Sequence, residues 1–180
     1  MKIFVSGGAG YIGSHTCIEL LKKGFEILVF DNLKNGSKIC LDRIKVIAGP
    51  KIKFFKGDVR NFEKLSEAMT YFSPDAVIHF AGVKAVNESV ENPLKYYDIN
   101  VNGSRVLLEA MEKSKCQKII FSSSATIYGD NDNLPYNENH QPNPKNPYGR
   151  TKLIVENMLK DWVKTNQNNK AVCLRYFNPA

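Results

Sequence analysis

Ser6-Gly7-Gly8-Ala9-Gly10-Tyr11-Ile12-Gly13 is a glycine-rich turn near the start of the chain. It comes after the apolar run Ile3-Phe4-Val5 and precedes a helical pattern. A strand, a glycine-rich turn and a helix in this order form a site for a dinucleotide pyrophosphate. The glycines let the backbone approach the phosphates, and the helix N-terminus offers free N–H groups. Because the glycine spacing here differs from the commoner G-x-G-x-x-G, the interpretation also needs support from residues downstream of the turn.

An acidic residue ends the second predicted strand, about 20 residues after the turn, as dinucleotide-binding folds require. The strand is Glu26-Ile27-Leu28-Val29-Phe30-Asp31, and Gly24 stops the helix before it. The Asp31 carboxylate can accept hydrogen bonds from ribose hydroxyls and would repel a 2′-phosphate, which predicts NAD rather than NADP. The alternative interpretation is that Asp31 is an ordinary turn residue before Asn32.

Strand and helix patterns alternate along the chain, which predicts an α/β fold: a doubly wound, Rossmann-type parallel sheet with helices on both faces. Right-handed crossovers give the strand order 3-2-1-4-5-6, with the ligand crevice at the carboxyl ends of the strands. At 180 residues, the chain is predicted to form one domain over 1–180. The predicted strands are 2–6, 26–31, 51–56, 75–80, 117–122 and 171–176, and the predicted helices are 11–23, 37–48, 61–72, 85–91, 94–115 and 147–166.

Each predicted strand ends in a cluster of glycine or polar residues, and parallel strands bring these ends to one rim of the sheet. The clusters are Gly7–Gly13, Asp31-Asn32, Gly57-Asp58-Val59, Phe80-Ala81-Gly82, Ser122-Ser123-Ser124 and Tyr176-Phe177-Asn178. Six clusters at one rim predict a single extended site.

Composition excludes several other classes of function. The net charge is +7, but the lysines are dispersed, which indicates a solvated surface rather than a nucleic-acid site. We find neither an apolar run of about 20 residues, as a membrane span needs, nor a signal-peptide pattern. The four cysteines are scattered, which favours reduced thiols in a cytoplasmic protein over disulfides or a metal site. We assign no metal; His79 is predicted to be a satisfied core residue, and His15 and His140 receive no role.

Tyr148 and Lys152 lie four residues apart at the start of a predicted helix, on one face. Asn146 can cap that helix and Pro147 suits its first turn. A nearby ammonium lowers the pKa of a tyrosine by roughly 1–3 units, and oxidised nicotinamide adds to this. Tyr148 is therefore predicted to be a general base for a hydroxyl, with Ser124 bridging the substrate oxygen and the phenol. The alternative for the pair is surface packing of a common helical spacing.

These motifs resemble those of the extended short-chain dehydrogenases/reductases and, within that family, of the UDP-galactose 4-epimerases. The resemblance covers the whole chain. It rests on the ordered set Gly7–Gly13, Asp31-Asn32, Gly57-Asp58-Val59-Arg60, His79-Phe80-Ala81-Gly82, Lys84-Ala85-Val86, Ser122–Gly129, Tyr148-x-x-x-Lys152 and Arg175-Tyr176-Phe177-Asn178-Pro179.

The resemblance implies NAD-dependent interconversion of UDP-glucose and UDP-galactose. Tyr148 would remove the proton of the sugar 4-hydroxyl while hydride passes from C4 to NAD⁺. The 4-keto sugar would then rotate, and hydride would return to its other face. The implied catalytic residues are Ser124, Tyr148 and Lys152.

The resemblance also implies two sets of binding residues. Cofactor contacts fall on Gly7, Gly10, Tyr11, Ile12, Gly13, Asp31, Asn32, Asn35, Asp58, Val59, Phe80, Ala81, Gly82, Lys84, Asn100, Ser122, Tyr148, Lys152 and Phe177. Substrate contacts fall on Lys84, Ser124, Thr126, Tyr148 and Asn178. Ile99 departs from the family, some of whose members carry a second asparagine beside Asn100.

Family members continue for well over a hundred residues beyond this point, so we expect the chain to be the cofactor-binding part, with the C-terminal substrate lobe absent. We therefore expect NAD binding with little turnover by the chain alone. The other expected partners are a UDP-hexose substrate and a second copy of the chain, paired through 94–115 and 147–166; we expect no nucleic acid and no membrane partner.

Three alternatives stay open at this point. A 4,6-dehydratase is disfavoured because Ser124-Ala125-Thr126 lacks the Thr-Asp-Glu that dehydration uses. An epimerase for N-acetylated, uronic or pentose sugars stays open, since much of the pocket lies outside the chain. A non-catalytic NAD-binding module would have no need of Ser124, Tyr148 and Lys152 together.

Overall fold

A computed structural model describes residues 1–130 and 134–178. Six parallel strands form one sheet in the order β3-β2-β1-β4-β5-β6, which confirms the predicted topology. The strands are β1 (Lys2–Ser6), β2 (Glu26–Asp31), β3 (Ile52–Lys56), β4 (Ala76–His79), β5 (Lys118–Ser124) and β6 (Lys170–Tyr176). Pro179 and Ala180, at the end of the predicted family motif, lie outside the described residues.

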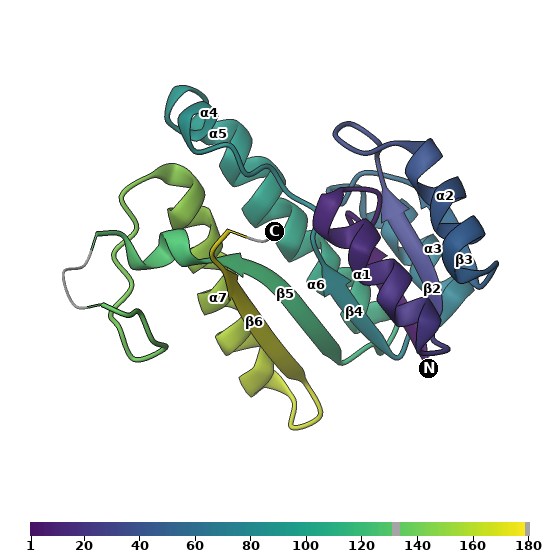
Figure 1. Ribbon diagram of the computed structural model, residues 1–180. Coiled ribbons are helices and arrows are strands. Elements are labelled where there is room, and N and C mark those ends of the chain that lie inside the picture. Colours follow the sequence, from purple (N-terminus) through teal and green to yellow (C-terminus); the bar gives the residue numbers. More distant parts are fainter. Residues whose placement is uncertain (131–133, 179–180) are drawn as a thin grey trace.

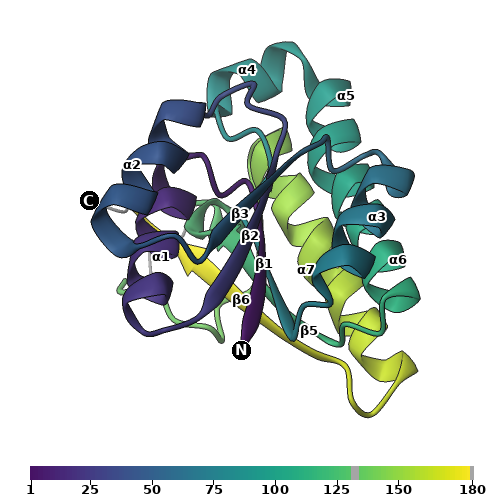
Figure 2. The same cartoon turned by 90° about the vertical axis from the view of Figure 1, so that its right-hand side faces the viewer.

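Helices cover both faces of the sheet, as predicted (Figures 1 and 2). On one face lie α1 (Tyr11–Lys22) and α2 (Lys38–Ala48), and on the other lie α3 (Phe62–Phe72), α6 (Gly103–Lys113) and α7 (Pro147–Thr165). The short α4 (Val86–Glu91) and α5 (Pro93–Tyr96) stand at the carboxyl end of the sheet. The sheet thus separates two hydrophobic cores, one on each face.

The central strands are apolar throughout because both of their faces are buried. Val5 and Val29 face the core under α1 and α2, whereas Phe4 and Leu28 face the core under α3 and α6. All four side chains are at most 1% exposed. These rigid strands fix the positions of the loops at their carboxyl ends.

The helix predicted over 94–115 is composite in the structure. It consists of α5, a π-helical segment η1 (Tyr97–Asn102) and α6. A π-helical turn inserts an extra residue into the helical repeat and is common at functional sites. Within it, the buried Asn100 side chain bonds both backbone groups of Val83, in the loop after β4.

The outer end of the sheet is less completely covered. On β6, Ala171 and Cys173 pack toward the core under α7, but Val172 and Leu174 on the opposite face are 52% and 39% exposed. The strand ends at the same rim as the others (Figure 1). Among the described residues, we find no helix that combines the length and the hydropathy required to cross a membrane.

Candidate functional site

One cleft of about 540 Å³ runs along the carboxyl ends of the strands. Residues following all six strands line it, including members of the six predicted clusters. Every residue predicted for cofactor, substrate or catalysis lines this cleft except Asn100. The parallel topology therefore brings the predicted set together in one place.

The glycine turn forms one wall of the cleft at the N-terminus of α1. Gly7 has φ +74°, and a Cβ there would lie 2.5 Å from the Ala81 backbone nitrogen. A Cβ at Gly13 would lie 2.4 Å from the Gly7 carbonyl oxygen. Gly10 precedes α1, and no side chain caps the helix there. The first-turn N–H groups thus face the cleft where a diphosphate would find hydrogen-bond donors and a favourable helix dipole.

Asp31 lies at the end of β2 with its side chain mostly buried, only 8% exposed. Its Oδ2 accepts a hydrogen bond from the Ala9 backbone N–H at 3.1 Å, and its Oδ1 accepts from the Leu33 N–H at 2.8 Å. The carboxylate therefore ties the glycine turn to the end of β2. Since each carboxylate oxygen has a second lone pair, it can still accept from a ribose hydroxyl.

Asp58, after β3, is held by a neighbouring arginine. The Arg60 Nε and Nη2 atoms donate to its two carboxylate oxygens at 2.8 Å, and Asn32 Nδ2 donates to Oδ2 at 3.1 Å. These bonds hold the pKa of Asp58 well below its usual value, chiefly through Arg60. Arg60 also contacts Asp98 in η1, so this end of the cleft is fixed to the π-helical segment.

Ser124, Tyr148 and Lys152 meet at the other end of the cleft. Ser124 ends β5, while Tyr148 and Lys152 lie one helical turn apart at the start of α7. The Lys152 Nζ is buried, donates to the Ser122 carbonyl oxygen at 2.7 Å, and lies 5.7 Å from the centre of the Tyr148 ring. The Ser124 hydroxyl accepts from the Thr126 backbone N–H and hydroxyl, which leaves its own proton to donate.

The expected lowering of the Tyr148 pKa by Lys152 does not occur in this structure. Burial raises the pKa of Tyr148 above its ordinary value, opposed by a hydrogen bond with Ser124. Burial also lowers the pKa of Lys152 to about 8, so the lysine is less fully charged than the sequence suggested. Desolvation by burial is the largest cause of both shifts.

Hydrogen bonds from several elements position the backbone of Tyr148. Its N–H donates to the Ser89 hydroxyl of α4 at 3.2 Å, and its carbonyl accepts from the Thr151 hydroxyl at 2.7 Å. The predicted Asn146 cap forms, with Oδ1 accepting from the Gly149 N–H at 2.8 Å. Asn100 donates to Thr151 at 3.1 Å, so it connects η1 to α7 behind the cleft wall.

Sequence reasoning missed several residues of the site. Lys34, Gly36 and Val83 also line the cleft. The sequence signal that could have found them is their position next to predicted residues such as Asn32 and Asn35. The sequence does not show, however, which side chains of a loop face the cleft. Ser89 was missed because its contact with Tyr148 spans 59 positions along the chain.

His79 is confirmed as a satisfied core residue. Its Nδ1 bonds the Ser6 hydroxyl at 2.6 Å and its Nε2 bonds the Ser104 hydroxyl at 2.9 Å. Ser104 donates its own proton to the Asn100 carbonyl, so it accepts from Nε2–H of a neutral ring. Burial and the charge of Lys152 lower the pKa of His79 to about 3.

The glycine turn, the acid after β2 and the long cleft fit a dinucleotide of the NAD type. The space that a Cβ would fill at Gly7 and Gly13 is occupied by backbone, so the turn has the close packing that phosphate binding needs. Asp31 then lies four strands from β6, roughly 19 Å at the usual strand spacing, a span suited to an extended dinucleotide.

Comparison with known proteins points the same way. The model of the "NAD dependent epimerase/dehydratase family" matches residues 3–180. UDP-glucose 4-epimerase of Bacillus subtilis is 49% identical over 179 residues, which are 99% of this chain and 53% of that protein. The enzyme of Neisseria meningitidis serogroup C is 50% identical with the same coverage. The chain thus spans about half the length of these curated relatives.

Solved structures show the same relationship. UDP-glucose 4-epimerase from Bifidobacterium longum, in complex with NAD⁺ and UDP, superposes with a TM-score of 0.97 at 44% identity, covering 99% of this chain and 54% of that one. The enzyme from Stenotrophomonas maltophila, with bound NAD and formylated UDP-arabinopyranose, gives 0.96 at 44% identity, with coverage of 99% and 53%. The predicted resemblance to these epimerases is confirmed, and NAD is the cofactor of the family. By its fold, its glycine turn and its match over residues 3–180, the chain belongs to the NAD dependent epimerase/dehydratase family.

Proposed function

We propose that the chain binds NAD along the cleft, with the pyrophosphate at the glycine turn and the nicotinamide beside Tyr148 and Lys152. The observation that carries the proposal is the convergence of Ser124, Tyr148 and Lys152 at one end of a cleft whose other end is built around Asp31. The cofactor residues predicted from the sequence are proposed to make these contacts. Asn100 is the exception, because its amide already bonds Val83 and Thr151.

We further propose that these residues serve the interconversion of UDP-glucose and UDP-galactose at C4. Bound NAD supplies a reversible hydride acceptor next to the sugar. Tyr148 takes the proton of the 4-hydroxyl and later returns it, and Ser124 orients the same oxygen by donating its own proton. Lys152 fixes the start of α7 through its bond to the Ser122 carbonyl oxygen. Thr126, Lys84 and Asn178 line the side of the cleft that would face the sugar nucleotide.

Proton transfer at neutral pH requires that the Tyr148 pKa fall from its raised value. The positive charge of oxidised nicotinamide favours a nearby phenolate, and it does so only in the oxidised form. We therefore expect the Tyr148 pKa to be lower with NAD⁺ than with NADH, although both ligands occupy the same cleft.

A dehydratase is the less favoured alternative. Among the described residues that line the cleft, the carboxylates are Asp31 and Asp58, and both lie at the end remote from Tyr148. Elimination of water needs an acid and a base near the sugar, and position 125 offers only an alanine methyl.

Titration of the purified chain with NADH tests the binding proposal, with nicotinamide fluorescence as the readout. We expect saturable binding of one NADH per chain, and the same affinity within about twofold for Tyr148→Phe, because the phenyl ring keeps its packing. Release of NAD from the denatured protein provides an independent check. Absence of both NADH binding and released NAD would contradict the proposal.

The 180-residue chain by itself is proposed to bind NAD with little epimerase turnover, because Phe177 and Asn178 on the sugar side are exposed. Conversion of UDP-galactose, measured by coupled oxidation of the UDP-glucose formed, tests this. Rapid conversion that is abolished in Tyr148→Phe would establish an active epimerase and overturn the low-turnover proposal. NAD binding without conversion of UDP-galactose is the expected result, and it is also the result expected of a non-catalytic NAD-binding module.

We also propose a homodimer that pairs α5, η1 and α6 with α7 of each copy. These elements carry exposed apolar side chains, Leu94 at 81% and Ile154 at 38% exposed, on the outside of the sheet layers. Sedimentation over a dilution series tests the proposal. A concentration-dependent dimer that dissociates in Ile154→Lys but persists in Leu174→Lys supports helix pairing, whereas the reverse result places the contact on β6.

A further inference from the structure

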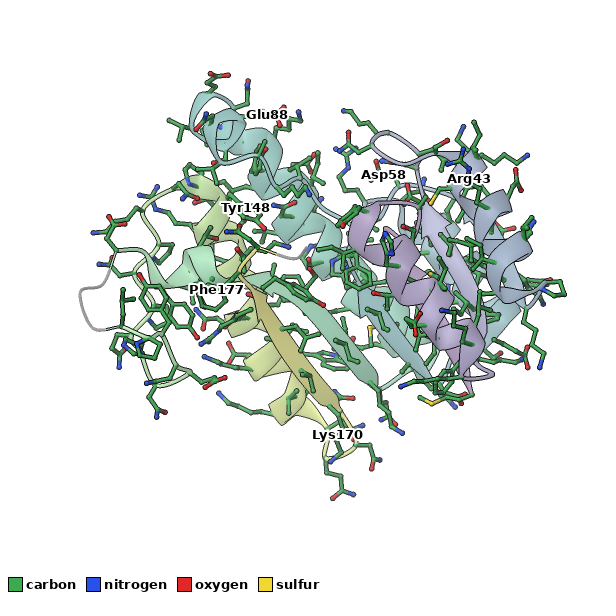
Figure 3. All side chains as sticks on the ribbon, in the orientation of Figure 1. Arg43, Asp58, Glu88, Tyr148, Lys170 and Phe177 are labelled. Carbon is green, nitrogen blue, oxygen red and sulfur yellow. The ribbon has the colours of Figure 1, made fainter. Side chains whose placement is uncertain are left out.

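Phe177 is an exposed aromatic residue at the mouth of the cleft. It comes directly after β6, is 61% exposed and lines the cleft on the same side as Ser124 and Tyr148. In the register of the sheet, Ser124 pairs with Tyr176, so Phe177 stands one residue beyond the level of Ser124. Figure 3 shows Tyr148 and Phe177 at the same end of the sheet, on α7 and after β6.

A second aromatic ring supports Phe177 from the side away from the cleft. The rings of Tyr136 and Phe177 stack with centroids 6.1 Å apart and planes at 24°. Tyr136 lies between η2 (Ala125–Tyr128) and α7. This stacking restricts the orientations that the exposed Phe177 ring can take.

Tyr136 is itself fixed on two sides. Its hydroxyl donates to the Gly129 carbonyl at 3.1 Å, and its ring stacks on the buried Tyr128 with centroids 5.2 Å apart and planes at 13°. The Arg175 guanidinium donates to the Tyr128 hydroxyl at 2.9 Å and lies 5.1 Å over its ring. Phe177, Tyr136 and Tyr128 thus form an aromatic stack with a charged anchor at its inner end.

Arg175 connects the aromatic stack to a residue that lines the cleft. Arg175 pairs with Glu156, which is 1% exposed, and the Ser123 hydroxyl donates to Glu156 at 2.5 Å. Ser123 also lines the cleft. One end of the stack is therefore bonded to the sheet through Arg175, and at the other end Phe177 lines the cleft.

We propose that Tyr136 is a positioning residue for the nicotinamide end of the bound dinucleotide, acting through Phe177. The inference rests on the proposed NAD function. Phe177 lies next to β6, four strands from Asp31 and roughly 19 Å away at the usual strand spacing. The stack therefore contacts the nicotinamide end of the ligand and leaves the adenosine end unaffected.

Two probes separate these ends: NADH, and ADP-ribose, which lacks the nicotinamide. For Tyr136→Ala, we expect the Kd of NADH to rise about three- to tenfold, the range of a lost aromatic contact. The Kd of ADP-ribose should stay within about twofold. Tyr136→Phe, which keeps the ring and removes only the bond to Gly129, should bind both ligands like the wild type. Both Kd values come from calorimetry on the same preparations.

A double-mutant cycle tests whether Tyr136 acts through Phe177. Phe177→Ala should raise the Kd of NADH and leave the Kd of ADP-ribose unchanged. The double variant with Tyr136→Ala should then bind NADH as Phe177→Ala does. Additive losses, an equal loss for ADP-ribose, or unchanged NADH binding in Tyr136→Ala would each overturn the inference. If Tyr136→Ala loses its far-ultraviolet circular dichroism, Tyr136→Leu replaces it in the same comparison. If the wild type binds neither ligand, the NAD proposal is refuted as well. If the wild type binds both ligands and the variants have unchanged Kd values, only the role of Tyr136 is refuted.

Discussion

Burial of Lys152 and Tyr148 sets the electrostatics of the site at the scale of single residues. Each group loses hydration of its charged form, and this loss moves the two pKa values in opposite directions: up for the phenol and down for the ammonium. A tyrosine and a lysine four residues apart in the sequence are predicted to attract as ions. In the folded chain, desolvation favours their neutral forms, so the phenol needs a further positive charge nearby to ionise at neutral pH.

Lys152→Met tests the burial of the ammonium. An unfolded lysine titrates near 10.4, whereas Lys152 in the folded chain has a pKa of about 8. Between these pH values the unfolded chain binds more protons, so Lys152 makes stability rise with pH. The difference in free energy of unfolding, wild type minus Lys152→Met, should grow by about 2 kcal/mol from pH 8 to pH 10. Urea unfolding at several pH values measures this difference, and Lys38→Met, at an exposed lysine, is the matched control. A difference for Lys152→Met that does not change with pH would contradict the burial of the ammonium.

Asp31 should determine the choice between NAD and NADP. The 2′-phosphate of NADP would meet a mostly buried carboxylate that is already bound to two backbone N–H groups and cannot move aside. Repulsion between like charges about 4 Å apart costs about 4 kcal/mol at an effective dielectric constant of 20, so we expect NADPH to bind at least about a hundredfold more weakly than NADH. In Asp31→Asn this preference for NADH should fall, because the neutral amide removes the repulsion while the shape and one acceptor remain. Equal affinities of the wild type for the two would show that the ribose lies elsewhere.

At the scale of elements, the close contact between the glycine turn and α1 depends on missing side chains. Gly13→Ala places a methyl group 2.4 Å from the Gly7 carbonyl oxygen, so we expect a loss of about 1–3 kcal/mol in stability. Gly10→Ala is the matched control, since its nearest atom is the same oxygen at 3.4 Å. We expect Gly10→Ala to keep its stability and to weaken NADH binding, because its methyl group obstructs the N-terminus of α1. Thermal unfolding and NADH titration of both variants separate packing from binding; a stable Gly13→Ala protein would contradict the geometry.

Element boundaries were predicted to within about two residues, because apolar runs, glycine stops and caps are local signals. Strand β2 matches its predicted range, and the Asn146 cap and Pro147 start of α7 are where the sequence put them. The predicted 94–115 helix was wrong in its interior, where η1 interrupts it. The contacts of Asn100 with Val83 and Thr151, across 17 and 51 positions, accompany that interruption, and no local pattern reports them.

At the scale of the whole molecule, a buried ion pair joins the last third of the chain to the sheet. Glu156 of α7 bonds Arg175 of β6 at 2.8 Å and Ser123 of β5 at 2.5 Å. Glu156→Gln leaves the arginine without its counter-charge in a partly buried position, so we expect a loss of about 3–5 kcal/mol in the free energy of unfolding. Glu109→Gln, which breaks an exposed pair with Arg105, should cost no more than about 0.5 kcal/mol. Similar losses from the two in urea unfolding would contradict this account.

Local patterns, together with the handedness of parallel crossovers, were enough to predict the strand order, the NAD-type turn with its acid, and the six strand-end clusters that line the cleft. The fuller set of cleft residues came from the family resemblance. The protonation tendencies of Tyr148 and Lys152, the placement of Asn100 behind the cleft wall, and the stack from Tyr128 to Phe177 emerged only in the folded chain. These features depend on burial and on contacts between residues distant in the chain, which a linear pattern does not encode.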